Sequence, residues 1–226
     1  INAEANAVIS AFNHLCRNKK DEIPSLITFH DAVDSVRSVG DVINQYKTQH
    51  SRFKANVYEI VSDKTIIDEH GGKVWVAGIR LNGSKYSDGK LYTKSGILDI
   101  LRNDHEPKII MNAFMLTEGI DLPEINGVLL LCQKSDASLY QAISRGCRKT
   151  PGKINFNLYV TSEDSINVRV EDFLAELVKF TDGQFDFGGT IEDVNNGSTE
   201  EDDTEDYENS GIELPETAMY KNVKIS

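Results

Sequence analysis

The strongest candidate for chemistry in this chain is a short basic segment, Gln141-x-x-Ser144-Arg145-x-x-Arg148. Gln141, Arg145 and Arg148 stand at i, i+4 and i+7, positions that share one face of a helix. A guanidinium is always charged, and its forked donors match phosphate oxygens. The segment follows an apolar run, residues 127–132, that is typical of a central parallel strand. This spacing favours contact with a polyphosphate at the strand's carboxyl end, while a solvated basic helix face is the alternative.

A second candidate is the string Leu-Thr-Glu-Gly-Ile-Asp-Leu-Pro at residues 116–123, which follows an expected strand at residues 108–111. Gly119 allows the backbone to turn sharply or approach a ligand closely. Asp121 can accept hydrogen bonds from ribose hydroxyls or hold an arginine. Taken alone, the string is equally compatible with an ordinary strand-to-loop connection.

Several catalytic motifs are absent from the sequence. It has no G-x-x-x-x-G-K-[ST] string, so it has no P-loop with which to bind a nucleotide's phosphates. It also has no H-E-x-x-H or G-x-S-x-G string, and its five histidines are scattered, so none is assigned to a metal. The chain is therefore expected to lack the parts for self-contained hydrolysis.

Hydrophobic periodicity predicts helices that alternate with short apolar strands. Strands are expected at residues 25–29, 57–61, 108–111, 127–132 and 154–160, and helices at residues 3–17, 33–46, 95–102, 138–148 and 168–180. Asp31 is the expected N-cap of the second helix. Residues 65–90 read as an irregular excursion with a hairpin near Val74–Ala77. This alternation predicts an α/β fold with a mainly parallel sheet.

Charge divides the chain into three parts. The formal net charge of the 226 residues is 24 − 36 = −12, and nine acidic residues lie between Glu192 and Glu208, so the remainder carries −12 + 9 = −3. We expect one domain over residues 1–186, a solvated or disordered acidic linker or tail over 187–210, and a segment over 211–226 that docks back on the domain or leads into another. An alternative for the acidic run is competition with nucleic acid for a basic groove.

The composition also bears on the cellular compartment. The apolar runs are too short to cross a bilayer, and no basic segment followed by an apolar one begins the chain. The three cysteines are widely spaced and form no C-x-x-C pair, so a reducing, cytoplasmic setting without membrane contact is expected.

Three segments in this order resemble helicase motifs IV, V and VI. They are Phe29-His30-Asp31, the string at residues 117–123 and the basic segment at 141–148. The resemblance covers about residues 25–161 and points to the second, C-terminal RecA-like domain of superfamily 2 DEAD/DEAH-type helicases. It is closest to the DNA-dependent branch that reads L-T-E-G-[IV]-D-x-P and Q-x-x-G-R-x-x-R-K. The fold that it implies is a three-layer α/β/α RecA-like domain.

The resemblance implies catalytic roles for the basic segment. Arg145 and Arg148 would act as arginine fingers on the γ-phosphate of ATP, and Gln141 would position that phosphate and the attacking water. Nucleotide contacts are implied at Gly119, Asp121 and Glu118. ATP and Mg²⁺ would be bound mainly by a first RecA-like domain of the same polypeptide, which carries the P-loop and Walker B acid. This chain alone is accordingly expected to bind no cofactor or metal and to be inactive.

The resemblance also implies nucleic-acid contacts, with DNA favoured over RNA, at Phe29, His30, Asn112 and Thr117. Two positions depart from the family pattern: Ser144 replaces the usual glycine, and Ala113 stands where many relatives carry a phosphate-binding threonine. The resulting hypothesis is the second motor domain of an ATP-dependent helicase or translocase. The alternatives are a double-stranded DNA translocase subunit of a restriction or phage-type system, and a non-catalytic RecA-like interaction module.

Overall fold

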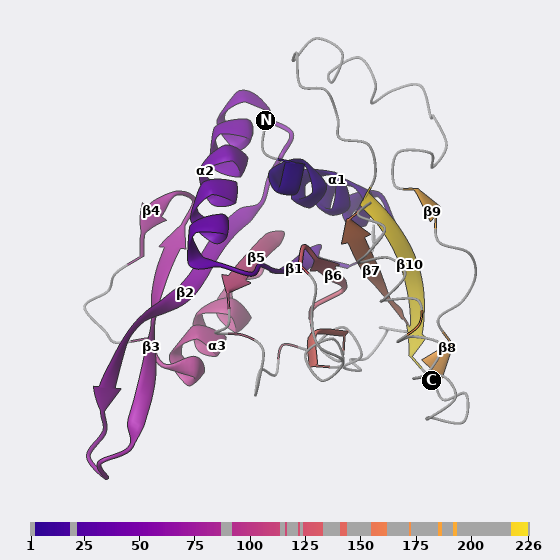
Figure 1. Cartoon of the computed structure of the whole chain (residues 1–226). Helices are drawn as coiled ribbons and strands as arrows, with labels where there is room; N and C mark the ends of the chain where they lie inside the picture. The colour runs from indigo at the N-terminus through magenta and orange to yellow at the C-terminus, as the bar shows by residue number, and fades with distance from the viewer. Residues whose placement is uncertain are drawn as a thin grey trace.

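The computed structural model describes residues 3–18, 22–86, 92–113, 116, 122, 124–132, 141–143, 155–161, 172, 185–186, 192–193 and 218–225. Within these ranges helices and strands alternate around one mixed sheet, which confirms the predicted α/β class (Figure 1). The helices are α1 (Ala3–Asn18), α2 (Val33–Gln49) and α3 (Lys94–Asn103). The strands are β1 (Ser25–Phe29), β2 (Asn56–Ile67), β3 (Lys73–Leu81), β4 (Ser84–Lys85), β5 (Lys108–Ala113), β6 (Gly127–Leu130), β7 (Asn155–Thr161), β8 (Phe185–Asp186), β9 (Glu192–Asp193) and β10 (Ala218–Ile225).

The strand order is β4-β3-β2-β5-β1-β6-β7-β10-β8, with β9 paired to β10. The five central strands are parallel to one another: β2, β5, β1, β6 and β7. The strands on both sides of them pair in antiparallel fashion. The predicted parallel sheet is therefore found at the centre of a mixed one. In the register of the centre, Ile27 of β1 lies between Ile110 of β5 and Val128 of β6.

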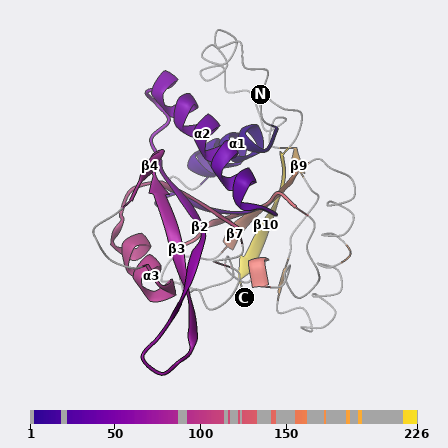
Figure 2. The same cartoon turned by 60° about the vertical axis from the view of Figure 1, so that its left-hand side comes forward.

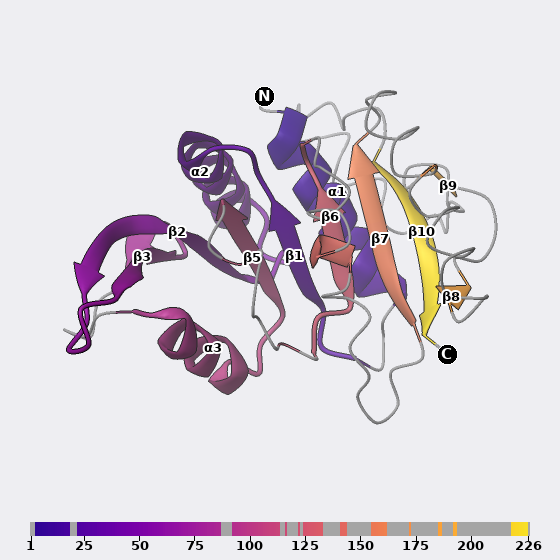
Figure 3. The same cartoon turned by 60° about the horizontal axis from the view of Figure 1, so that its bottom comes forward.

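Helices cover both faces of the central strands (Figure 3). Helices α1 and α2 pack on one face, where Phe12 and Ile43 are fully or almost fully buried with Ile109 in one apolar cluster. Helix α3 packs on the other face, where Ile97 and Ile110 belong to a second cluster. The described part of the chain thus has helix, sheet and helix layers.

Helix α2 begins at Val33, where the sequence predicts it, but the residue at its N-cap differs from the prediction. Its N-cap is Ala32, with φ −142° and ψ 155°, and no side chain caps the first turn. The prediction that Asp31 caps this helix was wrong, because the extended residue Ala32 stands between Asp31 and the first helical residue, Val33. The helix is instead held by its buried face, which includes Val36, Val39 and Ile43.

The region predicted as an irregular excursion is largely a regular hairpin. β2 extends to Ile67 and pairs antiparallel with β3, with a register shift between Ser62 and Lys64. The hairpin prediction near Val74–Ala77 is therefore confirmed, and the irregular assignment of residues 65–81 was wrong. In Figures 1 and 2 the end of this hairpin projects from the body of the molecule. An exposed hairpin buries little, so its strands lack the apolar run that marks a core strand.

Strand β10 joins the sheet beside β7, with Tyr220 opposite Tyr159 in antiparallel register. Glu192–Asp193, inside the predicted acidic linker, form β9 and pair with β10. The other residues of 187–210 lie outside the described ranges, as does most of the predicted helix 168–180, so the domain boundaries and the disorder of the linker stay predictions. Among the described residues, no helix is long and apolar enough to cross a membrane.

A buried polar contact joins α1 to β7. His14 Nδ1 lies 3.0 Å from the hydroxyl of Tyr159, which also accepts a hydrogen bond from Asn157 Nδ2 at 3.0 Å. His14 is only 6% exposed, and this burial, with a smaller effect of Arg17, lowers its pKa to about 4. The folded protein therefore holds this imidazole in its neutral form.

This pKa predicts loss of stability in mild acid. The ordinary histidine pKa is 6.5, so between pH 6.5 and 4 the unfolded chain binds a proton that the folded chain does not. The free energy of unfolding should fall through that window, by about 2–3 kcal/mol from this residue. Urea unfolding at several pH values measures it, and His14→Gln should flatten the dependence.

The matched control is His70→Gln, because the side chain of His70 is 85% exposed. This variant should keep the pH dependence of the wild type. An equal pH dependence in His14→Gln and wild type would contradict the assignment to His14.

Candidate functional site

The carboxyl ends of β5, β1 and β6 lie next to one another at one edge of the sheet, because these three strands are adjacent and parallel. In open α/β sheets, ligands bind in the crevice outside the carboxyl ends of the strands. The segment Phe29-His30-Asp31, which we name the 29–31 turn, starts at the last residue of β1. The string at residues 116–123 follows β5. The structure thus places the first residues of two predicted segments, 29–31 and 116–123, at the same edge of the sheet.

The 29–31 turn is built around a chain of hydrogen bonds from a buried histidine. His30 Nε2 lies 2.9 Å from the hydroxyl of Thr28, and His30 Nδ1 lies 2.9 Å from the hydroxyl of Ser35 in α2. The Ser35 hydroxyl donates to the carboxylate of Glu4 in α1 at 2.5 Å. His30 Nδ1 also lies 3.5 Å from Glu4 Oε2, and its interaction with that carboxylate is the main cause that lowers the pKa of Glu4. The chain links β1, α2 and α1 at the start of the candidate site.

Burial limits what the side chains of this turn can contact. Phe29 is 1% exposed and His30 is 2% exposed, whereas Asp31 and Ala32 are exposed. In this conformation Phe29 and His30 therefore hold the turn in place. The exposed residues at this point of the chain are Asp31 and Ala32.

Asn112, another predicted contact residue, bridges three segments. Its Nδ2 donates to the carbonyl of Thr28 at 2.8 Å, and its Oδ1 accepts from the backbone N–H of Leu116 at 3.2 Å. Its own carbonyl accepts from the N–H of His30 at 3.1 Å. Asn112 is fully buried, so its amide positions the chain that leads into residues 117–121 and ties it to the 29–31 turn.

The other predicted site residues are described in part. Residues 141–143 are helical, with Gln141 half-buried and with Ala142 and Ile143 buried in the same apolar cluster as α3. The remaining ones lie outside the described residues: Thr117, Glu118, Gly119, Asp121, Arg145 and Arg148. The structure therefore brings Phe29, His30 and Asn112 together, and the roles of the others stay predictions.

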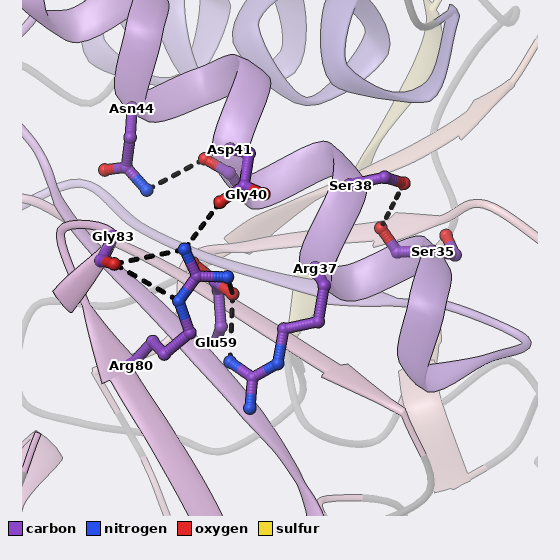
Figure 4. A network of polar contacts seen from close by, with 9 residues as sticks. All are labelled: Ser35, Arg37, Ser38, Gly40, Asp41, Asn44, Glu59, Arg80 and Gly83. Carbon is purple, nitrogen blue, oxygen red and sulfur yellow. Dashed lines mark hydrogen bonds and ion pairs between the residues drawn. The ribbon is translucent and has the colours of Figure 1, made fainter. Parts of the chain in front are cut away.

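A second polar cluster, which the sequence analysis missed, lies under α2 (Figure 4). The Glu59 carboxylate, in the middle of β2, accepts from Arg37 Nη1 of α2 at 3.0 Å. Arg80 Nη1 of β3 lies 3.1 Å from the same oxygen, Oε2, and Arg80 Nη2 donates to Asp41 at 2.5 Å. Two guanidiniums therefore hold one buried carboxylate and join α2 to β2 and β3.

Burial dominates the electrostatics of Glu59. Its side chain is not exposed at all, and the loss of solvation raises its pKa against the opposing effect of Arg37 and Arg80. Gly40 of α2 makes room for it, since an added Cβ there would lie 2.5 Å from Glu59 Cδ. The sequence does hold one signal for this cluster, a lone carboxylate inside the apolar run Val57–Val61.

No protein-family model matches this chain, and no curated protein matches it in sequence. The described residues also contain no group of three or more His, Cys, Asp and Glu side chains that could hold a metal ion. The described side chains Phe29, His30 and Asn112 hold the polypeptide at this edge of the sheet.

The role of Asn112 predicts a sharp difference between two similar variants. Asn112→Asp keeps an acceptor for Leu116 but places an acceptor-only oxygen against the Thr28 carbonyl in a fully buried position. It should cost about 1–3 kcal/mol or more of unfolding free energy. Asn103→Asp, at an exposed position on α3, should change it by about 0.5 kcal/mol or less. Urea unfolding compares them, and equal effects would contradict the bridging role.

Proposed function

We propose that this chain is the second RecA-like motor domain of an ATP-dependent nucleic-acid helicase or translocase. In this proposal it grips the backbone of a nucleic acid and supplies Arg145 and Arg148 to ATP bound by a first RecA-like domain. One observation carries the proposal. The segments that resemble motifs IV and V start from adjacent parallel strands, β1 and β5, and the strand before the motif VI-like segment, β6, lies next to β1.

The bridge made by Asn112 supports this function. A motor must couple the state of its nucleotide to its grip on nucleic acid. Asn112 joins the chain at Leu116, which leads into the proposed nucleotide-contacting residues, to the turn at His30, which belongs to the proposed nucleic-acid contact. A displacement of one segment would therefore act on the other through a short, buried hydrogen-bonded path.

The described start of the basic helix is also compatible with arginine fingers. Ala142 and Ile143 are buried against the sheet, whereas Gln141 is half-buried. On a helix that continues with the same period, Arg145 and Arg148 share the side of Gln141 and not the buried side. Such a helix would present both guanidiniums at a surface that a neighbouring domain can close upon.

The chemistry assigned to this chain is electrostatic. ATP would supply the phosphoryl group that is transferred to water. Arg145 and Arg148 would neutralise charge that develops in the transition state, and Gln141 would orient the attacking water. Grip on the nucleic acid would be independent of sequence, through phosphate contacts and not through base edges.

The test uses the polypeptide in which this domain is joined to a P-loop domain. Arg148→Ala should lower kcat by roughly 10³- to 10⁵-fold, because an arginine finger acts on charge that forms in the transition state. Binding of ATP and of nucleic acid should persist, and Arg148→Lys should not restore turnover since an ammonium lacks the planar fork. Steady-state kinetics at saturating nucleic acid measures this effect.

Arg102→Ala, at an exposed position on α3, is the matched control and should leave kcat unchanged. A kcat for Arg148→Ala within about threefold of wild type, with weaker and less salt-dependent nucleic-acid binding, would identify Arg148 as a surface cation instead.

A second expectation concerns this chain by itself. It contains no phosphate-cradling loop in its sequence, so the purified 226-residue chain should hydrolyse no ATP, with or without nucleic acid. Turnover that follows the chain through purification and disappears in Arg145→Ala would overturn the division of the site between two domains.

A further inference from the structure

The end of the β2–β3 hairpin, residues 62–76, forms an arm whose surface the proposed motor function does not explain. Three large hydrophobic side chains are exposed among the described residues: Ile23, Ile67 and Trp75. Two of them lie on this arm, with Ile67 63% exposed and Trp75 58% exposed. An exposed tryptophan beside an exposed isoleucine favours a binding surface over an ordinary solvated one.

The arm extends from the same edge of the sheet as the candidate site. Pairing between β2 and β5 ends at Val61 and Ala113, which is the carboxyl end of β5. Residues 62–67 continue past that end, and at about 3.3 Å per residue they reach roughly 20 Å beyond it. In Figures 1 and 3 the arm stands clear of the helices. A strand of nucleic acid that crosses the 29–31 turn would have this arm on one side.

Four exposed side chains share one face of the arm, which we name the Trp75 face: Thr65, Ile67, Lys73 and Trp75. Thr65 pairs directly with Trp75, and Ile67 pairs with Lys73; opposite residues of an antiparallel pair project to the same side. Further in along β3, Ala77 continues this face and is buried in the same apolar cluster as Ile97 of α3. The Trp75 face thus prolongs the side of the sheet that α3 covers.

Charged side chains lie on both faces of the arm, with Lys64 on the face opposite Trp75. Lys73 lies on the Trp75 face, and Lys94 is exposed at the start of α3 on the same side of the sheet. Asp63 lies on the opposite side, since an added Cβ at Gly78 would be 3.4 Å from Asp63 Cβ and 3.6 Å from Arg37 Nη2 of α2. The Asp68 carboxylate is used in the turn, and Glu69 is at the tip. The Trp75 face itself is therefore aromatic, apolar and positive.

The arm is fixed at both ends. At the tip, Asp68 Oδ1 accepts from the N–H groups of His70 at 2.9 Å and Gly72 at 2.7 Å, and Gly71 turns the chain at φ 79°. At the root, Arg80 and Arg37 hold the buried carboxylate of Glu59 (Figure 4). A surface held in this way loses little entropy when it binds a partner.

We propose that the Trp75 face binds single-stranded nucleic acid, with a base stacked on Trp75 and the backbone phosphates next to Lys73. Bases stack on exposed aromatic side chains whatever their sequence, and nearby cations follow the phosphates. This inference rests on the proposed function for its choice of ligand. It goes further by placing a base contact on a segment outside the 29–31, 116–123 and 141–148 segments.

The chain itself provides the probe, because Trp75 is its only tryptophan. Titration of the 226-residue chain with a short oligothymidylate should quench the tryptophan emission in a saturable manner. The quenching should weaken as salt is raised, since lysine contacts to phosphate release counterions. Absence of quenching in a chain whose circular dichroism shows it to be folded would overturn the proposal.

Three variants separate stacking from simple apolar contact, with affinity measured by anisotropy of a labelled oligothymidylate. Trp75→Ala should bind about 5- to 100-fold more weakly, and Trp75→Phe should retain most of the affinity because it keeps an aromatic face. Ile23→Ala removes an exposed hydrophobic residue just before β1, at the opposite edge of the sheet, and should bind as the wild type does. Equal affinity in Trp75→Ala and wild type would overturn the proposal.

Two further results would separate nucleic-acid binding by the Trp75 face from self-association of the chain and from the motor function. An emission shift that depends on protein concentration without oligonucleotide would assign the Trp75 face to a second copy of the chain and overturn nucleic-acid binding there. The motor function is tested separately by kcat in Arg148→Ala. If the oligonucleotide quenches Trp75 but Arg148→Ala keeps its kcat, the chain binds single strands and the proposed motor function is wrong. If Arg148→Ala loses kcat but no quenching occurs, the chain is a motor domain and the proposed binding by the arm is wrong.

Discussion

Every residue of β1, β5 and β6 is buried, and this constraint determines where the rest of the chain lies. These strands pair in parallel, as is typical of strands covered on both faces, and each parallel strand is reached by a crossover that returns the chain to the other edge. Helix α2 makes that return before β2, and α3 makes it before β5. All three strands consequently end at one edge, where Asn112 can join two of the segments that leave it.

Close packing against these strands also restricts single residues. An added Cβ at Gly127, the first residue of β6, would lie 2.7 Å from Leu15 Cδ2 of α1 and 3.0 Å from Leu26 Cδ1 of β1. Both leucines are fully buried, so neither can move aside without disturbing the core. Helix α1 can therefore approach the centre of the sheet only because the strand begins with a residue that has no side chain.

The sequence was sufficient for the elements that bury a continuous apolar surface. Strand β5 and helix α3 were predicted to within a few residues because their apolar periodicity reports burial directly. A hairpin near Val74–Ala77 was predicted, but the length and regularity of the arm were missed because both its strands are exposed and mix lysine, threonine and carboxylates with a few apolar residues. Strand β10 was missed because its partner, β7, lies more than fifty residues earlier in the chain, and no local pattern reports such a pairing.

The candidate site was predicted unevenly for related reasons. The resemblance to helicase motifs implied nucleic-acid contacts at His30 and Asn112, but the sequence could not show that each side chain would be buried and hydrogen-bonded within the chain. Glu59 was overlooked because a carboxylate in a strand is usually solvated, and only the fold brings Arg37 and Arg80 to it. Hydrogen bonds between distant segments depend on tertiary structure, and one sequence contains no record of them.

The buried carboxylate of Glu59 has a consequence for the orientation of the arm. A one-residue slip in strand register moves every side chain to the opposite face, and within the described ranges the arm from Lys64 to Val76 pairs only between its own two strands. Arg80 of β3 contacts Glu59 of β2, and these two residues are directly paired in the register. A slip would separate them and leave a buried charge without its partners, which is strongly unfavourable. The ion pair at the root therefore fixes the register of β2 and β3 up to the shift between Ser62 and Lys64, and the alternation along β3 from Ala77 places Trp75 on the side of the sheet that α3 covers.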